Sequence, residues 1–255
     1  MNQNSSRLDP IDRIAPSRRP DGRVVMYQKW RSLLFLHWEV PVEPLRALIP
    51  SGLEIDTFEG RAYVGLVPFT MRAVRPVGLP AAPWLSYFHE TNVRTYVHVA
   101  GRDPGVWFFS LEAANPVAVA LARSLFHLPY HHARMSLSRD ESGALRYASY
   151  RRWPGPLPAV SDIRCRPRGV PAPANPGTFD HFVLERYFLY ADHRGRLVRG
   201  QVHHHPYPAQ PAELLGLEES LLISTGLVRP SEAPVAHFAS GVDVEIFPLV
   251  ALAGS

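Results

Sequence analysis

The 26 prolines of this 255-residue chain restrict its fold more than any other feature of the sequence. Proline fixes φ and has no backbone N–H, so it interrupts long helices and is confined to strand edges, bulges and turns. We therefore expect short helices, many turns and locally interrupted strands. The hydrophobic share of 46% and the charged share of 20% are those of a globular protein, so the bulk of the chain is expected to be ordered.

Apolar and alternating segments between these prolines predict strands. Strand composition occurs at 33–40, at 53–58 and at 61–74, where Pro68 is expected at a bulge or a sheet edge. A short helix is expected at 42–50, because Pro50 stops it.

The clearest period-two pattern runs from Phe88 to Val99. Alternate residues of a strand lie on opposite faces of the sheet. One face carries Thr91, Val93, Thr95, Val97 and Val99, and the other carries Phe88, Glu90, Asn92, Arg94, Tyr96 and His98. The first face is typical of a core, whereas the second is polar and contains the best candidates for chemistry.

Turn signals join the strands into hairpins. The tight turn Gly101–Gly105 predicts a hairpin between this segment and 106–113. Further hairpins are predicted for 134–139 with 144–153, and for 179–192 with 197–206 after a helical lead-in at Thr178.

The other segments are assigned by composition. Asn115 and Pro116 are typical of a helix start and predict a helix at 115–126. A second helix is predicted at 212–227, closed near Gly226, and 235–252 is expected to be the last strand pair or one bent strand. Segment 154–177 is so rich in proline that we expect a long loop there.

Together these segments predict an α+β fold with a large antiparallel sheet and a few short helices. Residues 1–23 contain few apolar anchors and are expected to form a disordered arm. Residues 24–255 are expected to form a single domain, because no internal repeat or linker divides them.

The charge pattern limits the partners. The formal net charge is +4, but the cations are spread along the chain without a run of five, so we expect a small anionic ligand and no nucleic acid. No apolar run is long enough to span a membrane, and the lone Cys165 excludes an intrachain disulfide. We expect a cytoplasmic protein with no membrane partner, and a homo-oligomer is compatible with the sequence.

Four segments carry a family resemblance: 34–69, Phe88–Val97, 122–135 and 241–247. In this order they resemble the uncharacterised YqjF-like bacterial family (domain of unknown function 2071), which is placed in the acetoacetate-decarboxylase-like superfamily. The resemblance runs from about Tyr27 to Leu249. It implies a cone-shaped, barrel-like antiparallel sheet with an active site in its interior.

The resemblance also indicates which chemistry is missing. The decarboxylases form a Schiff base on a lysine, and their two active-site lysines align with Tyr130 and His131, in the expected turn after the helix. Neither side chain forms an imine, and Lys29 is the only lysine of the chain. Schiff-base decarboxylation is therefore not expected. The decarboxylase glutamate aligns with Glu90, whereas its arginine is replaced near His37 and Trp38.

The polar face of 88–98 is the first candidate site. If it faces a cavity, Arg94 can bind a carboxylate and Glu90 can act as a base, while Asn92 and Tyr96 add hydrogen bonds to the substrate. The alternative is an exposed strand whose polar face is simply solvated.

The second candidate is the segment after the helix. Tyr130 and His131 are suited to proton transfer, and Arg123 and His37 are expected to contact the substrate. The alternative is that Tyr130 packs under the helix while the histidines lie on the surface.

Two weaker signals remain. His203 and His205 share one face of a predicted strand and suggest a metal site with a third histidine. Asp243 and Glu245 likewise share a face, as paired carboxylates do. No GxSxG, GxGxxG or Walker sequence occurs, so no nucleotide or other cofactor is expected.

These observations predict a small-molecule-binding protein. If it is an enzyme, we expect it to perform general acid–base chemistry on a carboxylate- or carbonyl-bearing substrate. Two alternatives stay open at this point. One is a non-catalytic module that binds a metabolite or a lipid-like ligand, and the other is a metal-dependent enzyme with histidine ligands. A common point within hydrogen-bond reach of both Glu90 and His131 would favour catalysis.

Overall fold

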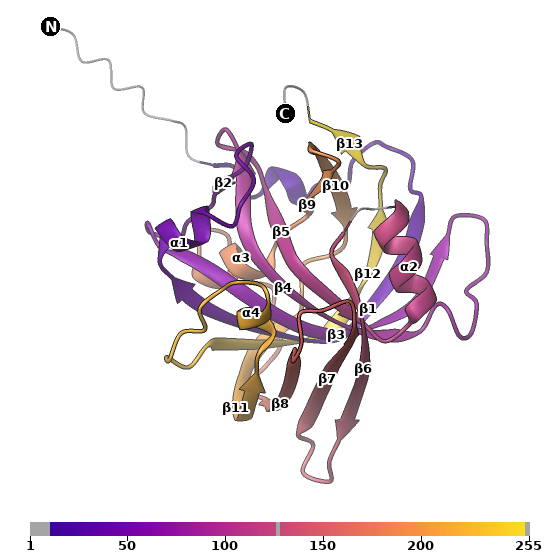
Figure 1. Ribbon diagram of the computed structural model, residues 1–255, viewed down its shortest axis with the longest axis vertical. Coiled ribbons are helices and arrows are strands. Elements are labelled where there is room, and N and C mark those ends of the chain that lie inside the picture. Colours follow the sequence, from indigo (N-terminus) through magenta and orange to yellow (C-terminus); the bar gives the residue numbers. More distant parts are fainter. Residues whose placement is uncertain (1–10, 126–127, 253–255) are drawn as a thin grey trace, which may run out of the picture.

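The computed structural model describes residues 11–125 and 128–252, and most of them lie in one large sheet (Figure 1). Thirteen strands are hydrogen-bonded in the order β13-β10-β9-β5-β6-β7-β8-β11-β12-β1-β3-β4-β2. The strands are β1 (Met26–Val40), β2 (Glu54–Ile55), β3 (Ala62–Pro76), β4 (Phe88–Val99), β5 (Arg102–Ala113), β6 (Tyr130–Arg139), β7 (Leu145–Trp153), β8 (Val160–Pro167), β9 (Phe188–His193), β10 (Arg196–His203), β11 (Ala209–Glu219), β12 (Val235–Ile246) and β13 (Val250–Ala251).

The sheet rings round without being a true barrel. Additional pairings join β5 to β4 and β10 to β12, so strands at distant places in the order also meet. Pairing is antiparallel except that β5 runs parallel to both β6 and β9. The helices are short: α1 (Val42–Arg46), α2 (Pro116–Leu125), α3 (Phe179–Leu184), α4 (Leu221–Ser224) and the 3-10 turn η1 (Ala15–Ser17). The predicted α+β architecture is confirmed.

The prolines lie where the sheet tolerates them. Pro68 is in β3 between β1 and β4, opposite a register shift of β1 that contains Ser32 at φ 51°. A bulge leaves one residue unpaired, so a missing N–H costs little there. The register irregularity opposite Pro68 agrees with the predicted bulge, whereas the alternative of a sheet edge is wrong because β3 lies between β1 and β4.

The β4–β5 hairpin turns earlier than predicted. Its loop is Ala100–Gly101, since Val99 pairs with Arg102 and both loop residues have positive φ. Two such residues form the type I′ turn that fits the twist of a hairpin. Asp103, inside the predicted turn, already belongs to β5.

Two predicted segments were wrong. Part of the expected loop 154–177 forms β8, and the first half of the expected helix 212–227 belongs to β11, followed by the four-residue α4. The two strands pair with each other, Leu217 opposite Ile163 and Leu214 opposite Cys165. Sheet pairing between distant segments therefore overrides the helical composition of 212–227.

The segment before β1 differs in part from the predicted arm. Residues 1–10 lie outside the described residues. In 11–23, Arg13 pairs with the buried Asp56, Arg19 pairs with Glu245 at 2.6 Å, and Pro16 is buried. This stretch therefore contacts the sheet.

The helix after β5 begins as predicted. The Asn115 side-chain oxygen accepts hydrogen bonds from the N–H groups of Val117 and Ala118, both at 3.0 Å, which caps α2. In the described residues, no helix combines the length and the apolar character needed to cross a membrane.

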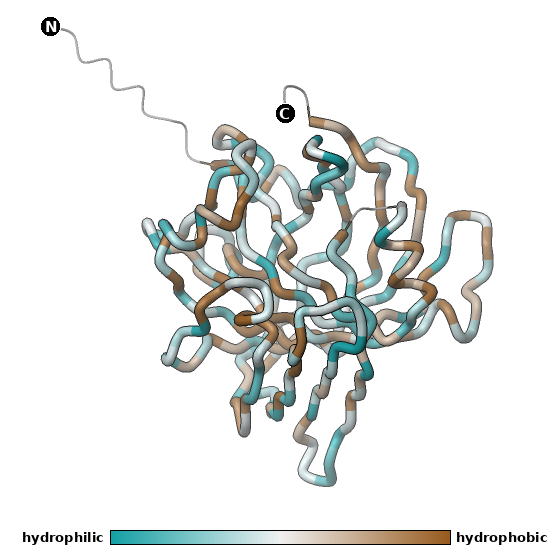
Figure 2. Tube along the Cα trace, viewed as in Figure 1, coloured by the Kyte–Doolittle hydropathy of each residue, from teal (hydrophilic) through white to brown (hydrophobic). Residues whose placement is uncertain are grey.

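Hydrophobic residues alternate with hydrophilic ones along the strands (Figure 2). The buried apolar residues form two main clusters. One includes Leu34, Trp38 and Ile163, and the other includes Phe35, Tyr96 and Phe182. Since Leu34 and Phe35 are neighbours in β1, the strand contributes to both clusters with its two faces. The second cluster borders the cavity described next.

Candidate functional site

A cavity of about 350 Å³ lies inside the ring of strands. Its polar lining residues are few: Gln28, Glu90, Asn92, Arg94, Tyr130 and Tyr207. The apolar lining residues come mainly from β1, β3, β5, α2 and β10, and include Trp30, Leu33, Phe35, Phe69, Met71, Phe88, Phe108, Leu111 and Leu121. A concave, mostly apolar space with a few convergent polar groups is typical of a small-molecule site.

The polar face of β4 points into this cavity. Glu90, Asn92 and Arg94 all line it and are 2%, 5% and 8% exposed. The opposite face is equally buried, with Thr91 and Thr95 almost fully enclosed. An exposed strand with a solvated polar face is therefore excluded.

Glu90 and Tyr130 form a hydrogen-bonded pair inside the cavity. The Tyr130 hydroxyl donates to Glu90 Oε2 at 2.8 Å. Burial raises the pKa of Glu90 to about 8, although the hydrogen bond from Tyr130 opposes the rise. Burial and the neighbouring carboxyl also raise the pKa of Tyr130 well above its ordinary value. At neutral pH both groups are therefore mainly protonated, so the side chain of Glu90 is a carboxylic acid there and not the base that the sequence suggested.

Arg94 is a buried cation without an acidic partner. Its Nη2 donates to the carbonyl of Val183 at 3.1 Å, and its guanidinium lies over the ring of Phe35 and near the ring of Tyr96. The Nε hydrogen has no partner, and no carboxylate in the described residues is within ion-pair distance of Arg94. A buried charge is normally paired, so this guanidinium has unused capacity for an anion.

Asn92 lies between these groups on β4. Its side-chain oxygen is buried and accepts no hydrogen bond from any described residue. A buried acceptor of this kind lacks the partner that it would have in water. The amide oxygen is therefore available to a donor on a ligand.

Tyr96 and His37 lie behind Arg94 rather than on the cavity wall. The Tyr96 hydroxyl donates to the carbonyl of Val183 at 2.9 Å. His37 is buried, neither ring nitrogen has a partner, and burial together with the Arg94 charge holds its pKa well below the ordinary value. Neither residue lines the cavity, so the predicted direct contact with a substrate is not supported.

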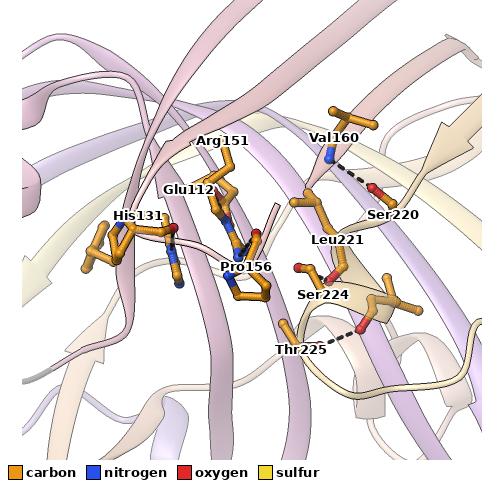
Figure 3. Close-up of polar contacts among 12 residues, drawn as sticks. Glu112, His131, Arg151, Pro156, Val160, Ser220, Leu221, Ser224 and Thr225 are labelled. Carbon is orange, nitrogen blue, oxygen red and sulfur yellow. Dashed lines mark hydrogen bonds and ion pairs between the residues drawn. The ribbon is translucent and has the colours of Figure 1, made fainter. Parts of the chain in front are cut away.

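His131 faces away from Glu90. Tyr130 and His131 are consecutive in β6, so their side chains lie on opposite faces, whereas the sequence suggested a turn. His131 lies beside the buried Glu112–Arg151 ion pair (Figure 3), and its Nδ1 is 2.9 Å from the carbonyl oxygen of Pro154. Burial lowers its pKa to about 4. His131 does not line the cavity, and its predicted catalytic role is unsupported.

Arg123 also lies outside the cavity wall. It is on the exposed side of α2, donates to the backbone carbonyl of Tyr130 at 2.6 Å and lies over the ring of Trp153. It therefore supports the position of Tyr130 without lining the cavity.

The two weaker candidate pairs, His203 with His205 and Asp243 with Glu245, lie outside the cavity wall. The ring centres of His203 and His205 are 6.5 Å apart. Across residues 11–125 and 128–252, no group of three or more His, Cys, Asp or Glu side chains is placed to hold a metal ion. Asp243 pairs with Lys29 at 3.6 Å and with Arg31, which also places the only lysine on the outer surface of β1.

Several residues that line the cavity were not predicted from the sequence, notably Tyr207, Gln28 and Trp30. Gln28 and Trp30 alternate along β1, before the segment that the sequence identified as a strand. Their spacing of two is a signal that an earlier strand start would have revealed. Tyr207 lies in a proline-flanked loop, where no pattern indicates orientation.

Comparisons with known proteins agree with this fold. Residues 27–243 match the model of the family DUF2071, described as "Uncharacterized conserved protein". The uncharacterized protein YqjF of Bacillus subtilis (strain 168) is 39% identical over 230 residues, which is 90% of this chain and 93% of that protein.

Solved structures are similar at lower identity. The acetoacetate decarboxylase of Legionella pneumophila is 16% identical, with a TM-score of 0.59 over 99% of this chain and 98% of its own. The enduracididine biosynthesis enzyme MppR, in complex with pyruvate, is 12% identical, with a TM-score of 0.61 over 92% of each chain. At these identities the likeness shows the fold, and the acetoacetate-decarboxylase-like architecture suggested by the sequence is confirmed.

Proposed function

Because this chain belongs to the DUF2071 family of uncharacterised conserved proteins, we propose its function from its own cavity: it binds a small organic acid and performs proton transfer on it. Arg94 binds the carboxylate of this acid, and Glu90, held by Tyr130, transfers a proton at a carbonyl-bearing part of the molecule.

The observation that carries the proposal is the unpaired guanidinium of Arg94 in a mostly apolar cavity. Burying an arginine away from water without a counterion is costly. A ligand carboxylate would supply the missing charge and accept hydrogen bonds in the planar geometry that guanidinium offers. That MppR, a protein of the same fold, is described as binding pyruvate supports a carboxylate ligand.

Proton transfer is supported by the Glu90–Tyr130 pair. A carboxyl group with a pKa of about 8 gives up and regains its proton near neutral pH, where general acid–base catalysis is most effective. Tyr130 keeps its own proton and donates to the same carboxyl oxygen in the ionised form, so it stabilises the anion that proton donation leaves behind.

A non-catalytic binding module is the second candidate. The cavity wall is largely apolar, and Glu90 and Tyr130 already form a hydrogen bond with each other. Buried polar groups without a catalytic role are normally paired in this way. His131, which the sequence suggested as a second proton donor, faces away from the cavity. The two candidates differ in whether a bound molecule exchanges protons.

One experiment separates them. The probe is 4-oxooctanoate, whose carboxylate and ketone represent the two groups in the proposal. Binding is measured by calorimetry, and exchange of the hydrogens beside the ketone for deuterium is followed by NMR. We expect the parent protein to bind the probe and accelerate exchange, Glu90→Gln to bind without acceleration, and Arg94→Met to bind at least tenfold more weakly.

Arg134→Met serves as the matched control, because it removes an exposed guanidinium of β6 outside the cavity wall and should leave binding unchanged. Binding without accelerated exchange in the parent would identify a binding module. Binding that is indifferent to Arg94→Met, in a variant with an unaltered circular dichroism spectrum, would refute the proposed carboxylate site.

A further inference from the structure

The two functional groups of the cavity lie at different places along β4. Phe88, Glu90, Asn92 and Arg94 are successive residues of one strand face, and all four line the cavity. At about 3.3 Å per residue, the Cα atoms of Glu90 and Arg94 are about 13 Å apart. The causes that shift the pKa of Glu90 are burial and Tyr130, with no contribution from Arg94, which agrees with this separation. A very short acid bound to Arg94 therefore does not reach Glu90.

The cavity opens beside α2. Leu85, Ala118, Leu121 and Ala122 line it, and Leu121 is 47% exposed. Helix α2 and the segment between β3 and β4 lie next to each other (Figure 1) and are linked by a 3.0 Å hydrogen bond from Asn115 to the carbonyl of Trp84. Arg94, in contrast, is 8% exposed. The mouth is thus at the Phe88 end of β4, and the guanidinium is at the deep end.

Between mouth and guanidinium the wall is apolar. The side chains opposite and beside Glu90 and Asn92 are aromatic or aliphatic: Trp30, Val67, Phe69, Met71, Phe88, Phe108 and Leu111. Glu90 is the one ionisable carboxyl among the described lining residues, and it is mainly protonated at neutral pH. Such a passage favours a hydrocarbon segment over a second charged group.

The unpartnered oxygen of Asn92 adds one requirement. It lies two residues from Arg94 on the same face, about 7 Å along the strand. A hydroxyl or amide N–H a few bonds away from the ligand carboxylate would donate to it. An acid without such a donor would leave the buried oxygen unsatisfied or bound to water.

We propose that the ligand is an elongated organic acid of medium chain length that binds with its carboxylate innermost on Arg94. A hydroxyl or amide N–H near the carboxylate donates to Asn92 Oδ1. The tail, apolar except for the carbonyl that the proposed function places beside Glu90, passes Glu90 and Tyr130 toward the mouth at α2. This inference rests on the proposed function and narrows its substrate class, because the atoms that reach Glu90 belong to the tail.

The test compares three probes by calorimetry: pyruvate, octanoate and 3-hydroxyoctanoate. Each buried methylene is expected to increase affinity about fourfold, so octanoate should bind at least tenfold more tightly than pyruvate. The 3-hydroxyl should increase affinity further in the parent protein, and Asn92→Leu should abolish this advantage while keeping octanoate binding.

A pair of variants on α2 tests the position of the tail. Ala122→Trp fills the mouth and should weaken octanoate at least tenfold while leaving pyruvate unchanged. Ala120→Trp places the same side chain on the exposed side of the helix, outside the cavity wall, and should change the binding of neither acid.

The outcomes separate the two levels of the proposal. Equal binding of pyruvate and octanoate, both lost in Arg94→Met, would overturn the elongated ligand and leave the proposed carboxylate site standing. Octanoate binding that survives Arg94→Met but not Ala122→Trp would overturn the carboxylate-inward orientation. If none of the three acids binds the parent protein, both the inference and the proposed function are wrong.

Discussion

At the scale of single residues, burial determines the protonation state of Glu90 and so the effect of pH on stability. Its pKa is about 8 in the folded protein and about 4.5 in an unfolded chain. Below pH 4.5 the carboxyl is protonated in both states. Between roughly pH 4.5 and 8 only the unfolded chain ionises it, so rising pH favours unfolding.

We therefore predict that Glu90→Gln gains stability relative to the parent as pH rises from about 5 to about 8, by at most about 4 kcal/mol. Urea unfolding at both pH values measures this, since other titrating groups contribute equally to the two proteins. An unchanged difference between parent and variant at the two pH values would show that Glu90 is already ionised in the fold.

The same scale shows what the sequence reveals about the site. Alternation along β4 was enough to place Glu90, Asn92 and Arg94 on one face, because a period of two fixes the side of each residue. The alternation along β4 does not determine which side chains of the adjacent strands point into the cavity. Assigning Tyr130 and His131 to a turn hid that they begin a strand and must diverge. His37 is buried, as expected of a core strand, but it is near the Arg94 charge and does not line the cavity, and no local pattern indicates that position.

At the scale of elements, one buried ion pair connects β5 with β7. Arg151 Nε is 3.1 Å from Glu112 Oε2 and its Nη2 is 2.5 Å from Glu112 Oε1, with both side chains almost fully buried. The pair crosses over β6, and Arg151 also donates to the carbonyl of Pro156 (Figure 3). The ion pair thus connects β5, which pairs with β6 in parallel, to the far strand of the β6–β7 hairpin.

We predict that Arg151→Met destabilises the protein by about 3–5 kcal/mol, because it leaves the carboxyl of Glu112 buried without its partner. The double variant Glu112→Gln with Arg151→Met should recover a large part of this loss. Equilibrium denaturation of the parent, the two single variants and the double variant gives the coupling energy. A coupling near zero would mean that the pair adds nothing beyond shape.

Element prediction fails where pairing is nonlocal. The hairpins β6–β7 and β9–β10 were predicted because turn residues join them directly. By contrast, β11 pairs with β8, which lies about forty residues earlier in the chain. β8 also pairs with its sequence neighbour β7, and the prolines before it led to the prediction of a loop. Leu214, Leu217 and Leu221 have helical spacing in the sequence, yet the first two lie in a strand. Composition alone cannot identify the partner that makes this segment a strand.

At the scale of the whole molecule, the ring of strands encloses a space that the core does not fill. The family resemblance predicted an interior site, whereas composition and periodicity alone predicted only an antiparallel sheet. The β4–β5 and β10–β12 pairings bring strands far apart in the sheet order together around the cavity. Enclosure by such distant contacts cannot be derived from local patterns, because each strand would look the same in an open sheet.

The enclosed Arg94 implies a conflict between stability and binding. A guanidinium without an acidic partner is costly to bury, and the carboxylate of the proposed ligand would remove that cost. We therefore predict that Arg94→Met is more stable than the parent without ligand, by about 1–3 kcal/mol, and gains nothing when octanoate is added. Thermal unfolding with and without octanoate measures both effects, and Arg94→Lys, which retains the charge, should gain no stability without ligand.

If Arg94→Met unfolds at a lower temperature than the parent in the absence of any ligand, the hydrogen bond to Val183 and the ring contacts outweigh the buried charge, and Arg94 is part of the framework of the fold.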